Sequence, residues 1–152
     1  MRSCDQLPVK SPKSLKSVPN MRHLVERFYN ELWNKVDLDC VDEILHRDVD
    51  FRGSVGLHAH GREAVCEYIS MVTTSLADYR CDIQTLIVDQ DQAAARMRFS
   101  GVHVGPFLGY QPSGRHVEWQ GAAFFTARDG LLDTIWVLGD LDTLRSQLDT
   151  NI

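Results

Sequence analysis

The stretch RHVEWQGAAFFTARDGLLDTIWVLG, which covers residues 115–139, decides the fold that the sequence predicts. It holds two long runs rich in aromatic and aliphatic side chains, residues 115–127 and 131–139, and such runs are typical of β-strands. The residues between them, Arg128-Asp129-Gly130, are a strong signal for a tight hairpin turn. We therefore expect two neighbouring antiparallel strands in the last third of the chain.

The segments upstream of this hairpin change their hydrophobic period once. Two more long strands are predicted at residues 79–88 and 92–104, joined by a tight turn at 89–91. Before them, apolar residues recur at three- and four-residue steps, which indicates helices. The remaining expected elements are helices at residues 21–33, 38–46 and 62–76, a short strand at 48–51, and a short helix or irregular tail at 141–148.

Helices that precede an antiparallel meander are typical of an α+β protein rather than of parallel βαβ units. A long sheet with three helices on one face curls around them, so we expect a cone-shaped, mostly antiparallel sheet. Helices fill its concave side only partly, which predicts an apolar pocket for a small apolar or aromatic ligand. Both faces of the strands are apolar, as Ala122 and Phe124 against Ala123 and Phe125 illustrate, so a homodimer is expected to cover the outer face.

Length and composition place the chain among ordinary globular proteins. Its 152 residues suffice for one domain, 43% of them are hydrophobic, and the net charge is -5. Residues 1–19 hold three of the five prolines and three lysines, and we expect a flexible tail there, followed by a single domain over residues 20–152. No Lys/Arg stripe follows the tail, so nucleic acid is not an expected partner.

The sequence also gives expectations about the compartment. No apolar run approaches the roughly 20 residues of a membrane span, and the N-terminus lacks the apolar core of a secretory signal. The four cysteines are widely separated and form no Cys-x-x-Cys pair, so we expect reduced thiols. These observations together predict a cytoplasmic protein that does not bind membranes.

Several short motifs, met in order along residues 21–148, carry a resemblance to a known family. They are FYNELWN at 28–34, GREAV at 61–65, GVHVGPFLG at 101–109, PSG at 112–114 and WVLGD at 136–140. The pattern resembles the SnoaL-like polyketide cyclases of the nuclear transport factor 2-like superfamily. The resemblance implies an α+β cone, a homodimer formed through the outer face of the sheet, and cofactor-free closure of a ring in a polyketide ester.

Asp140 is the first candidate catalytic residue. The resemblance places the acid/base aspartate of the family here, on the strength of the Trp-x-x-x-Asp spacing from Trp136. Trp136, Leu138 and Asp140 alternate along a strand, so they are expected to share one face. A carboxylate beside an indole would have its pKa raised by desolvation and could abstract and return a proton. The alternative is that Asp140 is the N-cap of the closing helix.

His103 is the second catalytic candidate, because it shares a strand face with Phe99 and could bond a substrate oxygen or Asp140 itself. Its alternative is a histidine that ends a strand and bonds to backbone. The loop at residues 105–114 is expected at the pocket entrance. The full set of predicted substrate-binding residues is Trp136, Leu138, Trp119, Phe99, Phe107, Tyr29, Trp33 and Tyr68, although the last three are also typical core residues.

Other functions stay open at this level. His58 and His60, with Asp50, lack the spacing of a good metal site, so neither a metal nor a cofactor is expected. Arg96 or Arg98 near Asp140 would suit an epoxide-hydrolase or hydroxylase variant. A binding module of the same fold, without catalysis, is the remaining alternative, since fold does not determine reaction.

Overall fold

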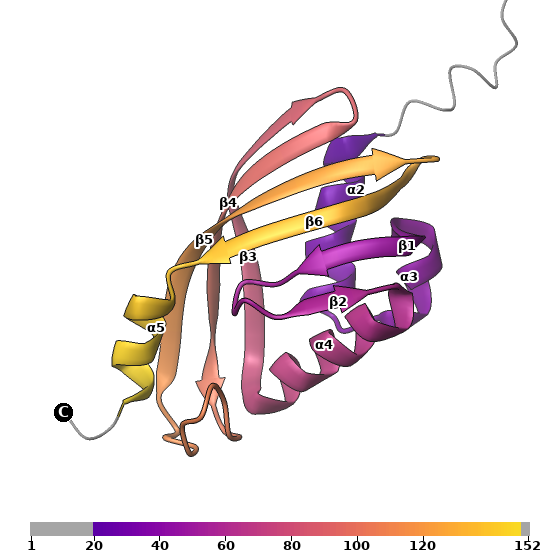
Figure 1. The fold of residues 1–152 in the computed structure, drawn as a ribbon. Coiled ribbons are helices and arrows are strands. Elements are labelled where there is room, and N and C mark those ends of the chain that lie inside the picture. The colour runs from indigo at the N-terminus through magenta and orange to yellow at the C-terminus, as the bar shows by residue number, and fades with distance from the viewer. Residues whose placement is uncertain (1–19, 150–152) are drawn as a thin grey trace, which may run out of the picture.

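The computed structural model describes residues 20–149, and the predicted tail at residues 1–19 lies outside them. One curved six-stranded sheet has the order β2-β1-β6-β5-β4-β3. Helices lie on its concave side, and α5 packs against β5 at the far end (Figure 1). The α+β cone expected from the sequence is therefore the fold of this chain.

Within residues 20–149, four α-helices, one π-helical segment and one 3₁₀ turn accompany the strands. The first helix, α2 (Met21–Arg27), continues into a π-helical segment, Phe28–Trp33. The others are a 3₁₀ turn at Leu38–Cys40, α3 (Val41–Ile44), α4 (Arg62–Ser75) and α5 (Leu141–Leu148). The side chain of Asn20 accepts a hydrogen bond of 3.1 Å from the His23 backbone N–H, so Asn20 is the N-cap of α2.

The strands are β1 (Leu45–Arg52), β2 (His58–His60), β3 (Leu76–Asp89), β4 (Gln92–His103), β5 (His116–Arg128) and β6 (Leu131–Gly139). The predicted meander is confirmed, because β3 to β6 pair antiparallel in sequence order. In the β5–β6 turn, Asp129 and Gly130 both have positive φ, at 55° and 79°. Two left-handed central residues are what a tight hairpin of this twist requires. Among the strands that the structure describes, only β1 pairs in parallel, along β6.

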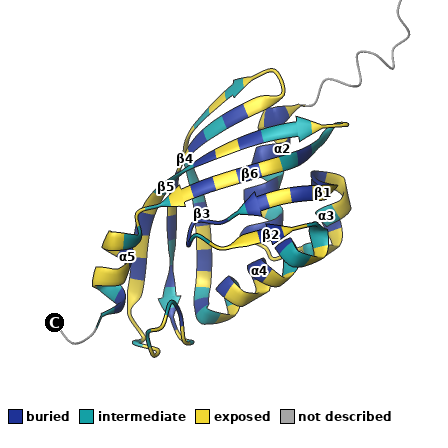
Figure 2. Ribbon diagram, viewed as in Figure 1, coloured by how far each residue is buried: buried dark blue, intermediate teal, exposed yellow. Residues whose placement is uncertain are grey.

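Burial alternates along the long strands, as the dark blue and yellow bands show (Figure 2). In β6, Ile135 and Val137 are buried, whereas Trp136 and Leu138 between and beyond them are 44% and 50% exposed. The concave face therefore holds the core together with α2, the π-helical segment and α4. Within residues 20–149, no helix is long and apolar enough to cross a membrane.

Candidate functional site

A small cavity lies between the concave face of the sheet and the N-terminal helical segment. Its free volume is about 10 Å³, room for about one water molecule, and every one of its nine lining residues is at most 9% exposed. The lining residues are Phe28, Tyr29, Trp33, Phe51, Ser54, Tyr79, Cys81, Phe99 and Val137. Its wall is thus mainly aromatic, with hydroxyl and thiol groups as its polar part.

The π-helical segment supplies two side-chain donors to this cavity. The backbone N–H of Asn34 donates to the Tyr29 carbonyl at 2.8 Å, an i→i+5 bond that widens the turn. Tyr29 and Trp33 are four residues apart and both are buried, as residues on one face of a helix can be. Such widened turns occur frequently at functional sites. Asn34 then fixes this end to β3, because its side-chain amide bonds the Cys81 carbonyl and N–H at 3.0 and 2.8 Å.

Buried side-chain polar atoms without a hydrogen-bond partner in the described residues include the Tyr29 hydroxyl, the indole nitrogens of Trp33 and Trp119, and Nε2 of His103. Tyr29 and Trp33 line the cavity, and Trp119 belongs to the same aromatic cluster, with its ring centroid 5.5 Å from that of Phe99. Buried donors are rarely left unpaired in proteins. The donors of Tyr29, Trp33 and Trp119 around one cavity indicate a place for acceptor atoms of a ligand or of water.

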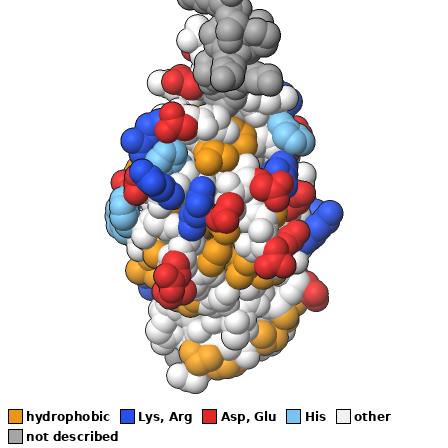
Figure 3. Space-filling view, turned by 90° about the vertical axis from the view of Figure 1, so that its right-hand side faces the viewer, with side chains coloured by type: hydrophobic (Ala, Val, Ile, Leu, Met, Phe, Trp, Pro, Cys, Tyr) orange, Lys and Arg blue, Asp and Glu red, His pale blue; other side chains and the backbone are white. Residues whose placement is uncertain are grey.

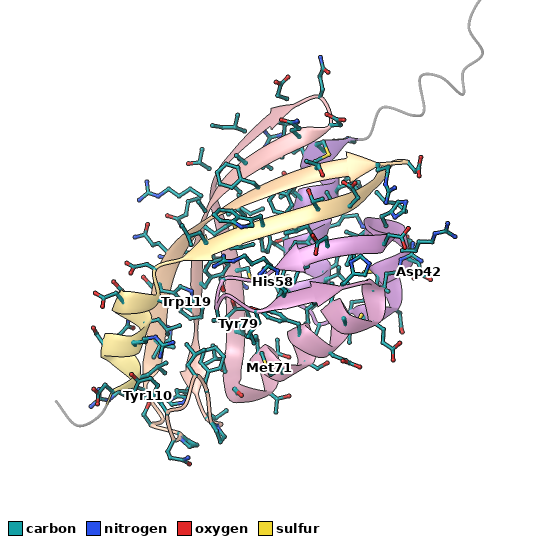
Figure 4. All side chains as sticks on the ribbon, viewed as in Figure 1. Asp42, His58, Met71, Tyr79, Tyr110 and Trp119 are labelled. Atoms are coloured by element: carbon teal, nitrogen blue, oxygen red, sulfur yellow. The ribbon has the colours of Figure 1, made fainter. Side chains whose placement is uncertain are left out.

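The polar groups of the cavity wall are uncharged at neutral pH. Burial raises the pKa of Tyr29 and Tyr79 well above the usual range of a phenol, and it raises the pKa of the Cys81 thiol. The Tyr79 hydroxyl also bonds to Cys81 and Ser54. Groups in this state donate hydrogen bonds and polarise carbonyl oxygens, but they do not accept protons as bases. Figure 4 shows Tyr79 and Trp119 beside the β1–β2 connection.

Asp140 lies outside this cavity, at the N-terminus of α5. Its carboxylate is exposed and accepts hydrogen bonds from the Thr143 backbone N–H at 3.1 Å and the Thr143 hydroxyl at 2.6 Å. Thr143 therefore lowers the pKa of Asp140, first through its hydroxyl and then through its N–H. The expected rise in pKa beside an indole is not found, because this carboxylate is solvated and caps a helix.

His103 is fully buried at the end of β4 and is tied to the loop that follows it. Its Nδ1 accepts from the Ser113 N–H at 3.2 Å and lies 2.9 Å from the Ser113 hydroxyl. The His103 N–H bonds to Arg115, whereas the Asp140 N–H bonds to Gln120. These two bonding partners, Arg115 and Gln120, are five residues apart, and five residues of extended chain span about 16 Å. The structure therefore does not bring the two catalytic candidates together.

The remaining predicted site residues fall into three places. Tyr29, Trp33 and Phe99 line the cavity, and Tyr68 and Trp119 contact its walls. Trp136 and Leu138 lie on the outer face instead, since β6 turns Ile135 and Val137 inward. Phe107 is buried in the loop after β4, where it exchanges backbone hydrogen bonds with Tyr110, and it is not part of the cavity lining.

Several lining residues escaped the sequence analysis, namely Phe28, Phe51, Ser54, Tyr79, Cys81 and Val137. Tyr79 and Cys81 had a usable signal, because they alternate with exposed or half-buried residues on β3. Ser54 had none, since it lies in the loop between two short strands. Its position depends on long-range contacts that a local pattern does not contain.

Charged groups are dispersed over the molecule. On the face in Figure 3, Lys and Arg side chains are interspersed with Asp and Glu and with hydrophobic patches. Arg96 and Arg98 are exposed on the outer face, where Arg98 lies 3.5 Å from Asp82. Among residues 20–149, no group of three or more His, Cys, Asp or Glu side chains is arranged to hold a metal ion.

An α+β cone with an aromatic cavity under its sheet defines a nuclear transport factor 2-like protein. Residues 23–148 match the family model of the SnoaL-like polyketide cyclases. The chain belongs to this family, as the motifs in its sequence indicated. No curated protein sequence matches the chain at a significant level.

Solved structures of similar proteins agree with this assignment. TsrD from Streptomyces laurentii is 31% identical, with 84% of this chain and 93% of TsrD covered and a TM-score of 0.75. A SnoaL-like protein from Jannaschia sp. CCS1 is 20% identical over 97% of this chain and 99% of that chain, with a TM-score of 0.77. IdmH from Streptomyces antibioticus is 22% identical over 85% and 98% of the two chains, with a TM-score of 0.73. The last two likenesses concern the fold alone.

Proposed function

We propose that this SnoaL-like protein binds a flat, carbonyl-rich or phenolic small molecule in its aromatic cavity. Oxygen atoms of the ligand accept hydrogen bonds from the donors of Tyr29 and Trp33, with Trp119 as a third donor at the cavity wall. The observation that carries this proposal is the set of buried donors without partners around one cavity. Leaving such groups unpaired costs about 1–3 kcal/mol each, which an acceptor atom would recover.

The cavity limits the size and charge of the ligand. Its free volume of about 10 Å³ has room for about one water molecule, so a ligand of one or two rings enters only when side chains of the wall move apart. None of the nine lining residues is charged, and an unpaired charge would be expensive to bury there. A neutral ester or ketone is therefore the preferred ligand.

The reaction that suits this family and this wall is a cofactor-free intramolecular aldol closure. A base removes a proton from a carbon between two carbonyls, and the resulting enolate carbon attacks a third carbonyl carbon. The new alkoxide then takes up a proton. Donors such as the Tyr29 hydroxyl would stabilise the enolate oxygen in a site without bulk water.

Asp140 is the proposed acid/base of this reaction. Its support is the Trp136-to-Asp140 motif and its position one residue beyond Gly139, whose Cα faces Trp119 and the Ser54 carbonyl at the cavity. Thr143 keeps the carboxylate ionised, so it is in the proton-accepting form, although its lowered pKa makes it a weak base. To reach a cavity ligand, the carboxylate must leave its cap on α5.

A non-catalytic binding module is the second candidate. One observation favours it, namely that no Asp, Glu or His lines the cavity. Calorimetric titration with 1,3-dihydroxynaphthalene, against naphthalene as the oxygen-free control, tests the binding that both candidates share. We expect saturable one-to-one binding of the diol and much weaker binding of naphthalene. Equal affinity for the two would contradict the role of the donors.

We also propose that the protein forms a homodimer through the outer face of the sheet. One register row runs across five strands as Arg52, Trp136, Phe124, Ala94 and Ile87. Its three large apolar side chains are 44–64% exposed, and the Phe124 and Trp136 rings lie 5.9 Å apart. The four residues from Trp136 to Ile87 are apolar, and an exposed apolar row of this length on a sheet face is typical of an interaction surface.

A further inference from the structure

The β1–β2 connection, residues 53–57, which we call the strap, is held by its own backbone bonds. The Gly53 N–H donates to the Leu57 carbonyl at 2.9 Å, and the Gly56 N–H donates to the Gly53 carbonyl at 3.0 Å. Gly56 has a φ of +90°, which favours glycine. Because its backbone bonds close within the loop, the strap can move as a unit without breaking the ladder of the sheet.

The strap covers the cavity where solvent comes nearest to it. Ser54 is the most exposed of the nine lining residues, at 9%, and its hydroxyl bonds to Tyr79 in the cavity wall. The adjacent Val55 is 7% exposed, so its side chain anchors the strap. The other eight lining residues belong to the π-helical segment or to strands, so the strap is the part of the wall that lies outside regular secondary structure.

Gly139, at the end of β6, lies directly against the strap. A Cβ atom at this position would overlap the Ser54 carbonyl oxygen and would lie 3.1 Å from Nε1 of Trp119. Gly139 is absent from the glycines with positive φ, so its backbone does not need glycine. Glycine weakens a strand interior, and its presence there often marks a place where another backbone approaches closely. The reason for glycine here is the clearance that the strap requires when it lies over the cavity.

We propose that the strap is a mobile loop that opens and closes the cavity, and that the absence of a side chain at Gly139 allows it to close. Opening moves Ser54 away from Gly139 and Tyr79 and admits a ligand to the aromatic wall. The proposal assigns Gly139 a positioning role, because it contacts the strap and not the ligand. The admission of a ligand rests on the proposed function, whereas the movement of the strap does not depend on it.

The native thiol of Cys81 reports on this movement, because it is 2% exposed and lies in the cavity wall behind the strap. The full chain is treated with N-ethylmaleimide, digested with trypsin, and followed by mass spectrometry. Cleavage after Arg80 and Arg96 gives a peptide in which Cys81 is the one thiol. Cys66, half-buried on α4, falls in a separate peptide and serves as an internal control.

The decisive variant is Gly139→Ala, in which the added methyl group holds the strap away from β6. We expect Cys81 to be labelled about tenfold faster than in the wild type, with Cys66 unchanged, since overpacking of this kind disfavours the closed state. Thr134→Val, an exposed site on the same strand, is the matched control and leaves both rates unchanged. If Gly139→Ala does not fold, Val55→Ser loosens the anchor of the strap and has the same expected effect.

Two results would contradict the proposed movement of the strap. One is a wild-type labelling rate of Cys81 in the folded variant. The other is acceleration of Cys81 and Cys66 together, with the steep urea dependence of global unfolding, because local opening exposes little surface and depends weakly on urea. Adding 1,3-dihydroxynaphthalene separates the two proposals. Failure of the diol to protect Cys81 from labelling counts against the cavity ligand. The labelling rate of Cys81 in Gly139→Ala tests the movement of the strap.

Discussion

The carboxylate of Asp140 and the hydroxyl of Thr143 form a hydrogen bond of 2.6 Å at the first turn of α5. The Thr143 backbone N–H adds a second bond to the same carboxylate at 3.1 Å. Together they make Asp140 an N-cap and lower its pKa. The residue that the family resemblance marks for acid/base chemistry thus has a structural task of its own, and the two tasks can be separated by substitution.

The cap predicts a specific pH dependence of stability. A carboxylate whose pKa is lower in the folded state stabilises the fold above its unfolded pKa, 3.8, and loses this effect as the pH falls through the folded value. Asp140→Asn caps nearly as well but does not titrate. We expect the melting temperatures of wild type and Asp140→Asn to keep a constant difference from pH 8 to about pH 5. Below pH 4 the wild type should fall relative to the variant, and parallel curves down to pH 2 would contradict the cap.

The acid/base role predicts a different result for the same variant. If Asp140 removes a carbon-bound proton, Asp140→Asn should slow deuterium exchange into ethyl acetoacetate roughly 10²–10⁴-fold, as measured by NMR. Thr143→Val is the companion variant, because removing the hydroxyl bond raises the pKa of Asp140 and moves the acid limb of the rate profile to higher pH. Full exchange activity in Asp140→Asn would assign the aspartate to the cap alone.

The outer face predicts the assembly state. Phe124→Glu places a charge in the middle of the row and should convert a homodimer to a monomer in analytical ultracentrifugation. Met71→Glu is the matched control, since Met71 is 40% exposed on α4 and receives the same charge away from the sheet. The control should remain dimeric. A wild type that sediments only as a 17.3 kDa species at micromolar concentration would contradict the proposal.

The unpaired Tyr29 hydroxyl predicts an unusual stability effect in the free protein. Tyr29→Phe removes a buried hydroxyl that has no partner, so no hydrogen bond is lost. We expect the free energy of unfolding in urea to stay level or to rise by up to about 1 kcal/mol in this variant. A drop of more than about 1 kcal/mol would mean that the hydroxyl already has a partner, such as ordered water.

Local sequence patterns predicted the fold well because its elements are locally encoded. The Asp129-Gly130 turn and the apolar runs around it fix β5 and β6, and the three- and four-residue spacing of Val65, Ile69 and Val72 fixes α4. The closing helix at Leu141–Leu148 also agrees with its predicted bounds.

The site was harder to predict because both faces of the sheet are apolar. Alternation placed Trp136 and Leu138 together, as the structure does, but it contained no information on which face meets the helices. The π-helical turn at Phe28–Trp33 has no signal in the sequence pattern. The contact of the strap with Gly139 joins segments 85 residues apart, and only the assembled sheet creates it.

The central claim is that the unpaired donors of the cavity bind the oxygen atoms of a ligand. The most direct test is the affinity of Tyr29→Phe for 1,3-dihydroxynaphthalene by calorimetric titration, with Tyr110→Phe in the loop after β4 as the control. Loss of one hydrogen bond should weaken binding roughly 2- to 13-fold in Tyr29→Phe and leave it unchanged in Tyr110→Phe. Wild-type affinity in Tyr29→Phe, or no saturable binding to any of the three proteins, would contradict the account.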